Sequence, residues 1–434
     1  LPPSAGQVSR DDATRFTDHP APSTIIFCPQ DLKDKLAKDS IFARIFILRK
    51  EIAKYIKFIK AWNGHFTRQT EQQAKNRLKE KQNSIGAMCG LVKGARAAPI
   101  TRLKVTTATD QGPKEEVTTD PQKIDGALQR IWGKIHAGNV GPATRSNLAT
   151  TFLREYGAYF AYSPEFQVPT LTSQHLADGI DAGIDNSSGL DGICQADLQI
   201  LSPLALDWLA AMLNAIERGA KWPEQMLVGR TAWLDTAEGP EPSLDPMEYR
   251  GLAILSKVYR LYAAIRLRHL QPWVKNWEHE ELFAGTSAAS GAEDAWFLLG
   301  INFEWARLLG LDFTGGSADI WKCFDQHQRG FLYHLLEAAG FPTPILNAYR
   351  AFHDNIMYHN TIGQGLGAPH FKPCSIPQGC PFSMMLTGFS FHPWVALMKA
   401  LQVTPRGLAD DRTITAIGEG HEARFKRGYE ATME

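Results

Sequence analysis

The segment Ser317–Asp325 limits the choice of fold more than any other stretch, because small, apolar and charged residues alternate along it. Alternation of this kind over a few residues predicts a β-strand. The strand would deliver the carboxylate of Asp319 to its exposed end. The following run, Arg329–Ala339, is amphipathic and closes on Gly340. The local plan is therefore a strand, a loop and a helix.

A second acidic site follows about ninety residues later. Val403–Leu408 leads into Ala409-Asp410-Asp411, and Arg412–Ile417 leads away. The pattern predicts a hairpin with two adjacent carboxylates at its tip. Adjacent acids repel each other, so such a turn is tolerable if it is solvated, and it becomes useful if a divalent cation neutralises it. We also expect the strand Arg412–Ile417 to have an unpaired or partly paired edge.

A turn-rich segment lies between the two acidic sites. It reads Ser375-Ile-Pro-Gln-Gly-Cys-Pro-Phe-Ser383 and enters an apolar helix, Met384–Leu401. The order along the chain is thus an acidic strand, a Pro-Gln-Gly loop and an Asp-Asp hairpin.

This order, with these residues, resembles the polymerase of LINE-type (non-LTR) retrotransposons, a class of reverse transcriptases. Asp319–Phe324 resembles the first palm motif, Ile376–Ser383 the second and Leu408–Asp411 the third. Upstream, Tyr249–Leu255 with Val258–Arg266 resembles the fingers motif, and Gly189-Leu-Asp-Gly192 resembles a still earlier one. The resemblance covers roughly residues 85 to 434 and implies RNA-templated DNA synthesis.

The resemblance implies an α+β fold, a right-hand polymerase with fingers and an antiparallel palm sheet packed by helices. We expect a helical N-terminal extension and no thumb. The expected parts are a disordered tail at 1–30, a basic helical extension at 31–150, a fingers-like region at 151–312 and a palm-like region at 313–434 that is incomplete at its C-terminal end.

The carboxylates have a clear expected role in such an enzyme. Nucleotidyl transfer needs an aligned 3′-hydroxyl and compensation for negative charge, which two Mg²⁺ ions, or Mn²⁺, supply. Carboxylates are suitable ligands for these hard cations. We assign Asp319, Asp410 and Asp411 as catalytic metal ligands, and the resemblance adds the backbone carbonyl of Ile320.

The resemblance also implies a nucleotide site. Phe324 would lie under the sugar and exclude a 2′-hydroxyl, although an aromatic residue in this position is otherwise most simply a core residue. Gln378 and Gly379 would line the nucleotide and the template, with the glycine allowing close backbone approach. Arg250 would hold triphosphate oxygens through its planar fork. The expected partners are an RNA template, a DNA primer and deoxynucleoside triphosphates.

Charge is unevenly distributed although the formal net charge of the 434 residues is zero. Between Ile41 and Val105 there are fifteen Lys or Arg residues and three Glu. The pattern suits either a solvated helix face or a surface that contacts phosphates. Our candidates for nucleic-acid contacts are Lys54, Lys57, Lys60, Arg68, Lys75, Arg77 and Lys79.

Two departures from the family pattern keep a rival open. Leu408 replaces the usual aromatic residue before Ala-Asp-Asp, and Asp235 stands where the fingers strand usually ends in Lys. Asp235 and the expected C-terminal truncation favour a catalytically silent, nucleic-acid-binding remnant of a retroelement, whereas the intact trio of Asp319, Asp410 and Asp411 opposes it. An RNA-templated RNA polymerase is a further rival, but Ala409 and Phe324 argue against it, since that class typically has Gly before the Asp pair and a polar sugar-sensing residue.

Other features set broader expectations. The six cysteines form no Cys-x-x-Cys pair, which indicates a reducing compartment. The longest apolar run is too short to span a bilayer, so we expect no membrane partner. The resemblance implies an intracellular protein of the cytoplasm and nucleus. Further expected elements are a loop at Thr106–Asp120, helices at Pro121–His136 and Ile200–Ala220, a strand at Met226–Leu234 and a strand-to-helix unit at Tyr249–Leu270.

Overall fold

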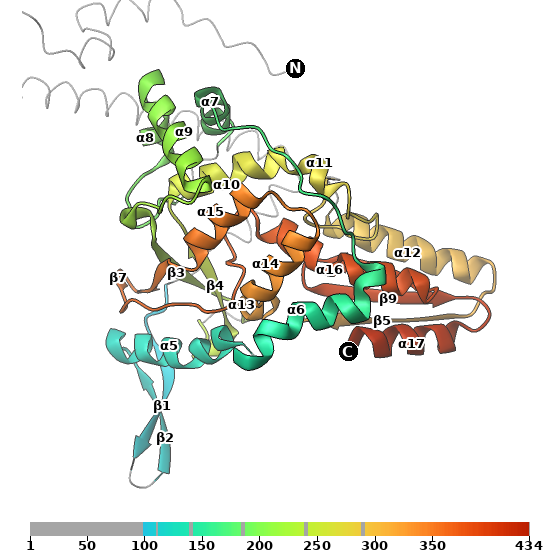
Figure 1. Ribbon diagram of the computed structural model, residues 1–434. Coiled ribbons are helices and arrows are strands. Elements are labelled where there is room, and N and C mark those ends of the chain that lie inside the picture. Colours follow the sequence, from blue (N-terminus) through green and yellow to red (C-terminus); the bar gives the residue numbers. More distant parts are fainter. Residues whose placement is uncertain are drawn as a thin grey trace, which may run out of the picture. The chain divides into compact units, whose positions relative to one another are not determined.

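The computed structural model describes residues 99–109, 112–138, 142–183, 187–237, 242–287 and 291–433 (Figure 1). The chain divides into two units, Leu1–Arg96 and Ala97–Glu434, and all described residues belong to the second. The expected tail and the seven basic candidates from Lys54 to Lys79 lie outside the described residues.

The described elements combine many helices with small, mostly antiparallel sheets, so the fold is α+β, as expected. The strands are β1 Leu103–Thr109, β2 Gly112–Thr118, β3 Val228–Asp235, β4 Tyr249–Ile254, β5 Phe313–Asp319, β6 Met357–Ile362, β7 Gly365–Leu366, β8 Thr404–Leu408 and β9 Asp411–Ile417. The helices are α5 Pro121–Ala137, α6 Pro142–Tyr156, α7 Ser173–Asp181, α8 Gln195–Gln199, α9 Pro203–Glu217, α10 Lys257–His269, α11 Gln271–Val274, α12 Ala292–Leu308, α13 Cys323–Gln326, α14 Arg329–Ala338, α15 Thr343–His353, α16 Ser383–Ala400 and α17 His421–Met433.

The prediction of a loop at Thr106–Asp120 is wrong. Most of this segment belongs to the antiparallel hairpin β1–β2, in which Leu103 pairs with Thr118 and Thr109 with Gly112. The segment is polar, but much of its polarity comes from threonines, which are β-branched and favour strands. Leu103 and Val105 are buried while Lys104 between them is exposed, so the base of the hairpin packs against the core and fixes its pairing.

A four-stranded sheet, in the order β4-β3-β6-β7, lies near this hairpin. β3 pairs antiparallel with β4 and parallel with β6. Trp132 of α5 packs against Trp233 of β3, with 4.8 Å between ring centroids. Ile124 and Leu128 of the same helix are fully buried in this smaller core. Helix α5 therefore covers one side of the sheet and begins at the expected residue, with Asp120 as its N-cap.

A three-stranded antiparallel sheet, β5-β9-β8, carries the acidic residues. The prediction that strand Arg412–Ile417 has an unpaired edge is wrong. This strand is β9, which is central in the sheet and pairs with β5 on one side and with β8 on the other. Figure 1 shows α17 on one side of these strands and α12 on the other. Ile414 and Ala416 of β9 are buried in the main core.

The main core joins this sheet to a group of helices. Tyr259 of α10 stacks on Phe352 of α15 at 3.6 Å between centroids, and α16 contributes Phe389 and Val395. Arg266 and Glu217 form a buried ion pair here, and the Tyr262 hydroxyl also donates a hydrogen bond to Glu217. Because both charges are paired and hydrogen-bonded, removing either partner would leave an uncompensated buried charge.

Within the described residues, none of the helices combines the length and the apolar composition that crossing a lipid bilayer requires.

Candidate active site

The sheet register brings the predicted carboxylates to one end of two neighbouring strands. Asp319 is the last residue of β5 and pairs directly with Asp411, the first residue of β9. Asp410 occupies the turn between β8 and β9, because Leu408 and Asp411 close the hairpin. Asp319 and Asp411 are exposed and Asp410 is half-buried. Residues some ninety positions apart in the sequence therefore form one acidic cluster.

The turn that presents Asp410 is strained. Ala409, the first of its two loop residues, has a φ of +54°. Tight hairpin turns need this left-handed conformation, which suits glycine and costs a residue with a Cβ atom free energy. Backbone strain of this kind is found at sites where geometry serves a function.

The carboxylates influence one another electrostatically. Although Asp411 is exposed as a residue, partial removal of its carboxyl group from water raises its pKa, and the negative charges of Asp410 and Asp319 raise it further. Burial also raises the pKa of the Cys323 thiol to about 12, with contributions from Asp410 and Asp319. Cys323 therefore stays a protonated thiol beside the cluster, and it lacks the thiolate character that a nucleophilic cysteine needs.

The acidic cluster has the donor chemistry of a Mg²⁺ site, because carboxylate oxygens are the ligands that this ion prefers. As the side chains stand, the described part of the chain contains no group of three or more His, Cys, Asp or Glu residues arranged to hold a metal ion. Like charges without a cation between them repel, and after partial desolvation this repulsion contributes to the raised pKa of Asp411. The paired backbone places the three carboxylates at one sheet end, and their side chains would have to rotate to share an ion.

Ile320 follows Asp319, and its carbonyl accepts a hydrogen bond from the Cys323 amide at 3.1 Å. A carbonyl oxygen has two lone pairs, so one remains for a further partner. The expected role of Ile320 as a backbone ligand stays a prediction.

The Pro-Gln-Gly loop is held between β4 and α13. The Ile376 amide donates to the Phe324 carbonyl at 2.8 Å, and the Ala253 amide of β4 donates to the Gln378 carbonyl at 2.7 Å. Gly379 has a φ of +117°, and a Cβ atom at this position would lie 2.2 Å from the Ala253 carbonyl oxygen. The close approach of two backbones therefore requires glycine here.

Two predicted nucleotide-binding side chains lie on either side of this loop. Phe324, in α13, is half-buried and packs against the main core. Arg250, in β4, is exposed and pairs with Leu234 of β3. The position of Phe324 suits both a core residue and a residue with one open face, so its contact with a sugar stays a prediction.

Sequence reasoning missed Lys322. Its backbone is left-handed, with a φ of +50°, at the start of α13. Its Nζ atom donates to the carbonyls of Met247 at 3.0 Å and Tyr249 at 3.3 Å, and lies 4.7 Å from the ring centroid of Trp132. Lys322 thereby ties the turn after Asp319 to the start of β4. The sequence shows only a single lysine between Trp321 and Cys323, and no local pattern indicates which residues it contacts.

Arg250 lies close enough to Lys322 to influence it. Burial lowers the pKa of Lys322, and the positive charge of Arg250 lowers it further while Asp325 opposes the shift. Two basic side chains therefore lie on the β4 side of Asp319.

Two basic residues near the fingers strand, Arg230 and Lys257, could stand in for the missing lysine by charge, but neither is exposed. Arg230 lies within β3 and is half-buried, and Lys257 is buried at the start of α10. Asp235, which stands at the lysine position, accepts hydrogen bonds from the amides of Ala237 at 2.9 Å and Ser243 at 2.7 Å. Its carboxylate therefore organises the connection between β3 and β4.

A network of buried polar side chains connects α13 to α5 and joins the start of α14 to the segment before the Pro-Gln-Gly loop. Asp325 contacts His136 of α5 at 3.3 Å, and Lys372 donates to Thr231 of β3 at 3.2 Å. Arg329 donates to the Lys372 carbonyl at 2.8 Å and to Asp354 at 3.0 Å. These bonds fix the backbone on which the Pro-Gln-Gly loop rests.

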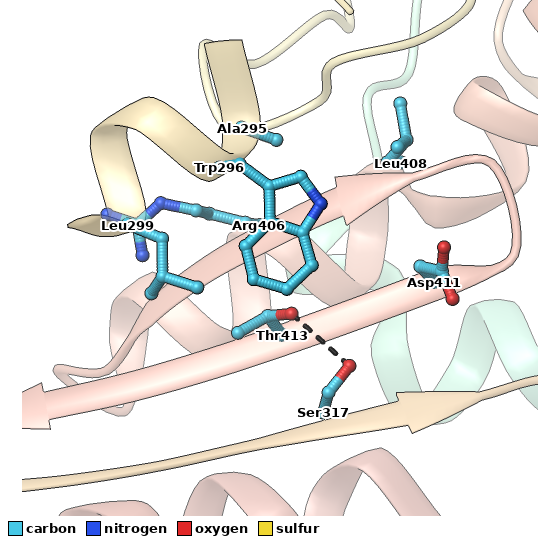
Figure 2. Close-up of a pocket in the computed structure, with 8 residues that line it drawn as sticks. All are labelled: Ala295, Trp296, Leu299, Ser317, Arg406, Leu408, Asp411 and Thr413. Atoms are coloured by element: carbon cyan, nitrogen blue, oxygen red, sulfur yellow. Dashed lines mark hydrogen bonds between the residues drawn. The ribbon is translucent and has the colours of Figure 1, made fainter. Parts of the chain in front are cut away.

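A small pocket of about 120 Å³ adjoins the acidic cluster. Figure 2 shows Trp296 of α12 over the hairpin strands, with Asp411 nearer the turn. The pocket is lined by Ala295, Trp296, Leu299, Ser317, Arg406, Leu408, Asp411 and Thr413. No local sequence pattern indicates this pocket, since its walls come from four separate elements.

A search of protein-family models finds none that matches the chain.

Proposed function

We propose that the protein is an RNA-templated DNA polymerase that adds deoxynucleotides to a primer 3′-hydroxyl. The observation that carries this proposal is the register of the three-stranded sheet, which pairs Asp319 with Asp411 and sets Asp410 in the adjoining turn. The order of the three motifs along the chain and the hydrogen bonds between the Pro-Gln-Gly loop and both β4 and α13 support it. On this proposal the four-stranded sheet belongs to the fingers and the three-stranded sheet to the palm.

The chain's own residues divide the work as follows. Asp319, Asp410 and Asp411 would hold two Mg²⁺ ions, whose chemistry when bound is to activate the attacking oxygen and to stabilise the charge on the phosphates. Arg250 binds triphosphate oxygens, in a region where Lys322 adds positive charge. The Gln378 backbone is fixed by its bond to Ala253 and lines the nucleotide.

Selection of the sugar falls to Phe324. An aromatic ring under the sugar leaves no room for a 2′-hydroxyl, and it therefore selects deoxynucleotides over ribonucleotides. The hydrogen bond from Ile376 to the Phe324 carbonyl fixes the backbone from which the ring projects.

A catalytically silent, nucleic-acid-binding remnant is the second candidate, and Asp235 favours it. Related polymerases place a phosphate-binding lysine where this chain has an acidic residue that bonds to its own loop. The two candidates differ in one outcome, since the remnant would bind a primed template without extending it.

Primer extension separates them. The full chain is given a DNA primer annealed to an RNA template, Mg²⁺ and labelled deoxynucleotides, and extension and binding are measured in parallel. We expect the wild type to extend the primer, Asp319→Asn to bind it without extension, and Asp207→Asn, an exposed control on α9, to match the wild type. Binding without extension by the wild type would support the remnant, and extension by Asp319→Asn would refute the catalytic assignment.

A further inference from the structure

The pocket beside the acidic cluster contains a buried arginine with little compensation. Arg406 of β8 is 7 % exposed, and its guanidinium donates a long hydrogen bond of 3.4 Å to the Thr415 hydroxyl. Among the described residues, no carboxylate lies within ion-pair distance of Arg406, and the nearby Glu281 is paired with Lys399 at 2.9 Å. A guanidinium that is mostly removed from water and has no carboxylate beside it favours an anion as a partner.

The other walls suit a sugar-phosphate unit. Thr413 donates to Ser317 at 3.3 Å, which places two hydroxyl groups side by side on the sheet (Figure 2), and the Ser317 hydroxyl donates to the Arg412 carbonyl at 3.3 Å. Trp296 is 70 % exposed, and its indole covers the pocket from α12. Exposed aromatic rings beside a basic group are typical of surfaces that bind nucleic-acid strands.

The pocket has a defined position relative to the cluster. Ser317 pairs with Thr413, and Thr413 pairs with Arg406, two residues along each strand from the level of Asp319 and Asp411. Two residues of a strand span about 7 Å, which is comparable with one nucleotide step of a nucleic-acid chain. Lys322 follows the Asp319 end of β5 and Arg250 lies close to it, whereas the pocket lies two residues back along the strands, so the pocket and the proposed triphosphate site are on opposite sides of the carboxylates.

We propose that this pocket binds the phosphodiester one nucleotide behind the primer 3′ end, with Arg406 contacting the phosphate, Ser317 and Thr413 the sugar-phosphate oxygens, and Trp296 the sugar or base. The proposal rests on the proposed function, because it is the reaction at Asp319 and Asp411 that places the 3′ end. A single guanidinium with two hydroxyls matches one phosphate charge better than the charge of a triphosphate.

The test measures binding of a fluorescent DNA primer, annealed to RNA, to the full chain by anisotropy in EDTA, without metal or nucleotide. One primer carries an uncharged methylphosphonate at the linkage nearest the 3′ end, and a control primer carries it several linkages upstream. We expect the methylphosphonate nearest the 3′ end to weaken binding of the primer to the wild type by about ten-fold at low salt. The same primer should bind Arg406→Met as well as the unmodified primer does, because this variant has already lost the charged contact. Equal effects of the methylphosphonate on wild type and Arg406→Met would overturn the proposal.

Two further variants, Trp296→Ala and Arg406→Lys, test the proposal in case Arg406→Met fails to fold. Trp296→Ala, at an exposed site, should weaken binding by about ten-fold through lost stacking. Its matched control is Trp208→Ala on α9, where the indole is 71 % exposed. Equal affinities of the two alanine variants would contradict the proposal. Arg406→Lys should retain the salt dependence that Arg406→Met loses, a change in slope of a little under one unit.

Inorganic pyrophosphate distinguishes the two sources of a phosphate group. If it displaces the primer from the wild type but not from Arg406→Met, the pocket binds free phosphates and the primer assignment is wrong. The result is also separable from the proposed function. If the protein does not extend primers but the methylphosphonate still weakens binding, only the proposed activity is refuted. If the protein extends primers but the methylphosphonate has no effect on binding, only the proposed pocket is refuted.

Discussion

Gly379 shows how one residue can be fixed by backbone geometry alone. Its φ of +117° and the 2.2 Å that would separate a Cβ atom from the Ala253 oxygen both exclude a side chain. The sequence indicated glycine for close approach to a nucleotide, and the structure adds close approach to β4. Lys322 illustrates the opposite case, because its partners Met247 and Tyr249 lie more than seventy residues away and no local pattern identifies them.

We expect Gly379→Ala to destabilise the protein by roughly 3 kcal/mol, since both the left-handed backbone and the overlap with Ala253 must be relieved. Primer extension should fall together with stability, because relief requires breaking the bond between Gln378 and Ala253. Chemical denaturation and extension assays measure the two effects. Gly300→Ala is the control, since a Cβ atom there meets nothing within 4 Å, and an equal loss in both variants would contradict the argument.

At the scale of elements, local patterns predicted much of what surrounds the site. Helices α5 and α14, the β4–α10 unit and the β8–β9 hairpin lie close to their expected positions. Contacts between distant elements could not be read from the sequence, including the parallel pairing of β3 with β6 and the central position of β9. The hairpin β1–β2 was missed because its polar threonines conceal a strand pattern.

The tie between α13 and β4 gives a prediction for Lys322. Lys322→Met removes two charge-assisted hydrogen bonds and frees the start of the strand that carries Arg250. We expect the apparent KM for deoxynucleotide to rise by about ten-fold, with a smaller change in kcat, because binding rather than bond formation depends on Arg250. Steady-state kinetics of extension measures both constants. Lys322→Arg keeps the charge and the donors and should recover part of the loss, and an unchanged KM in Lys322→Met would refute the tie.

For the molecule as a whole, the buried network around Lys372 links pH to stability. Burial lowers the pKa of Lys372 from 10.5 to about 8, while Asp325 opposes the shift. Below pH 8 the lysine is protonated in both states, and the cost of its buried charge is fully present. Between pH 8 and 10.5 the unfolded chain binds more protons, so this group makes the folded state more stable as the pH rises.

We therefore expect the wild type to gain about 3 kcal/mol of unfolding free energy relative to Lys372→Met between pH 7 and 10.5, the equivalent of the shift in pKa. Urea denaturation of both proteins at several pH values gives this difference, and other titrating groups cancel in the comparison. A difference that stays constant with pH would show that Lys372 keeps its ordinary pKa in the fold.

The central claim is that Asp319, Asp410 and Asp411 together hold divalent cations, and Mn²⁺ binding followed by electron paramagnetic resonance tests it most directly. The full chain is mixed with a dideoxy-terminated primer on an RNA template and the matching deoxynucleotide, and free Mn²⁺ is measured during titration. We predict that Asp319→Asn binds Mn²⁺ more weakly than the wild type by about ten-fold or more, whereas Asp207→Asn does not. Equal Mn²⁺ uptake by the wild type and Asp319→Asn would contradict the claim.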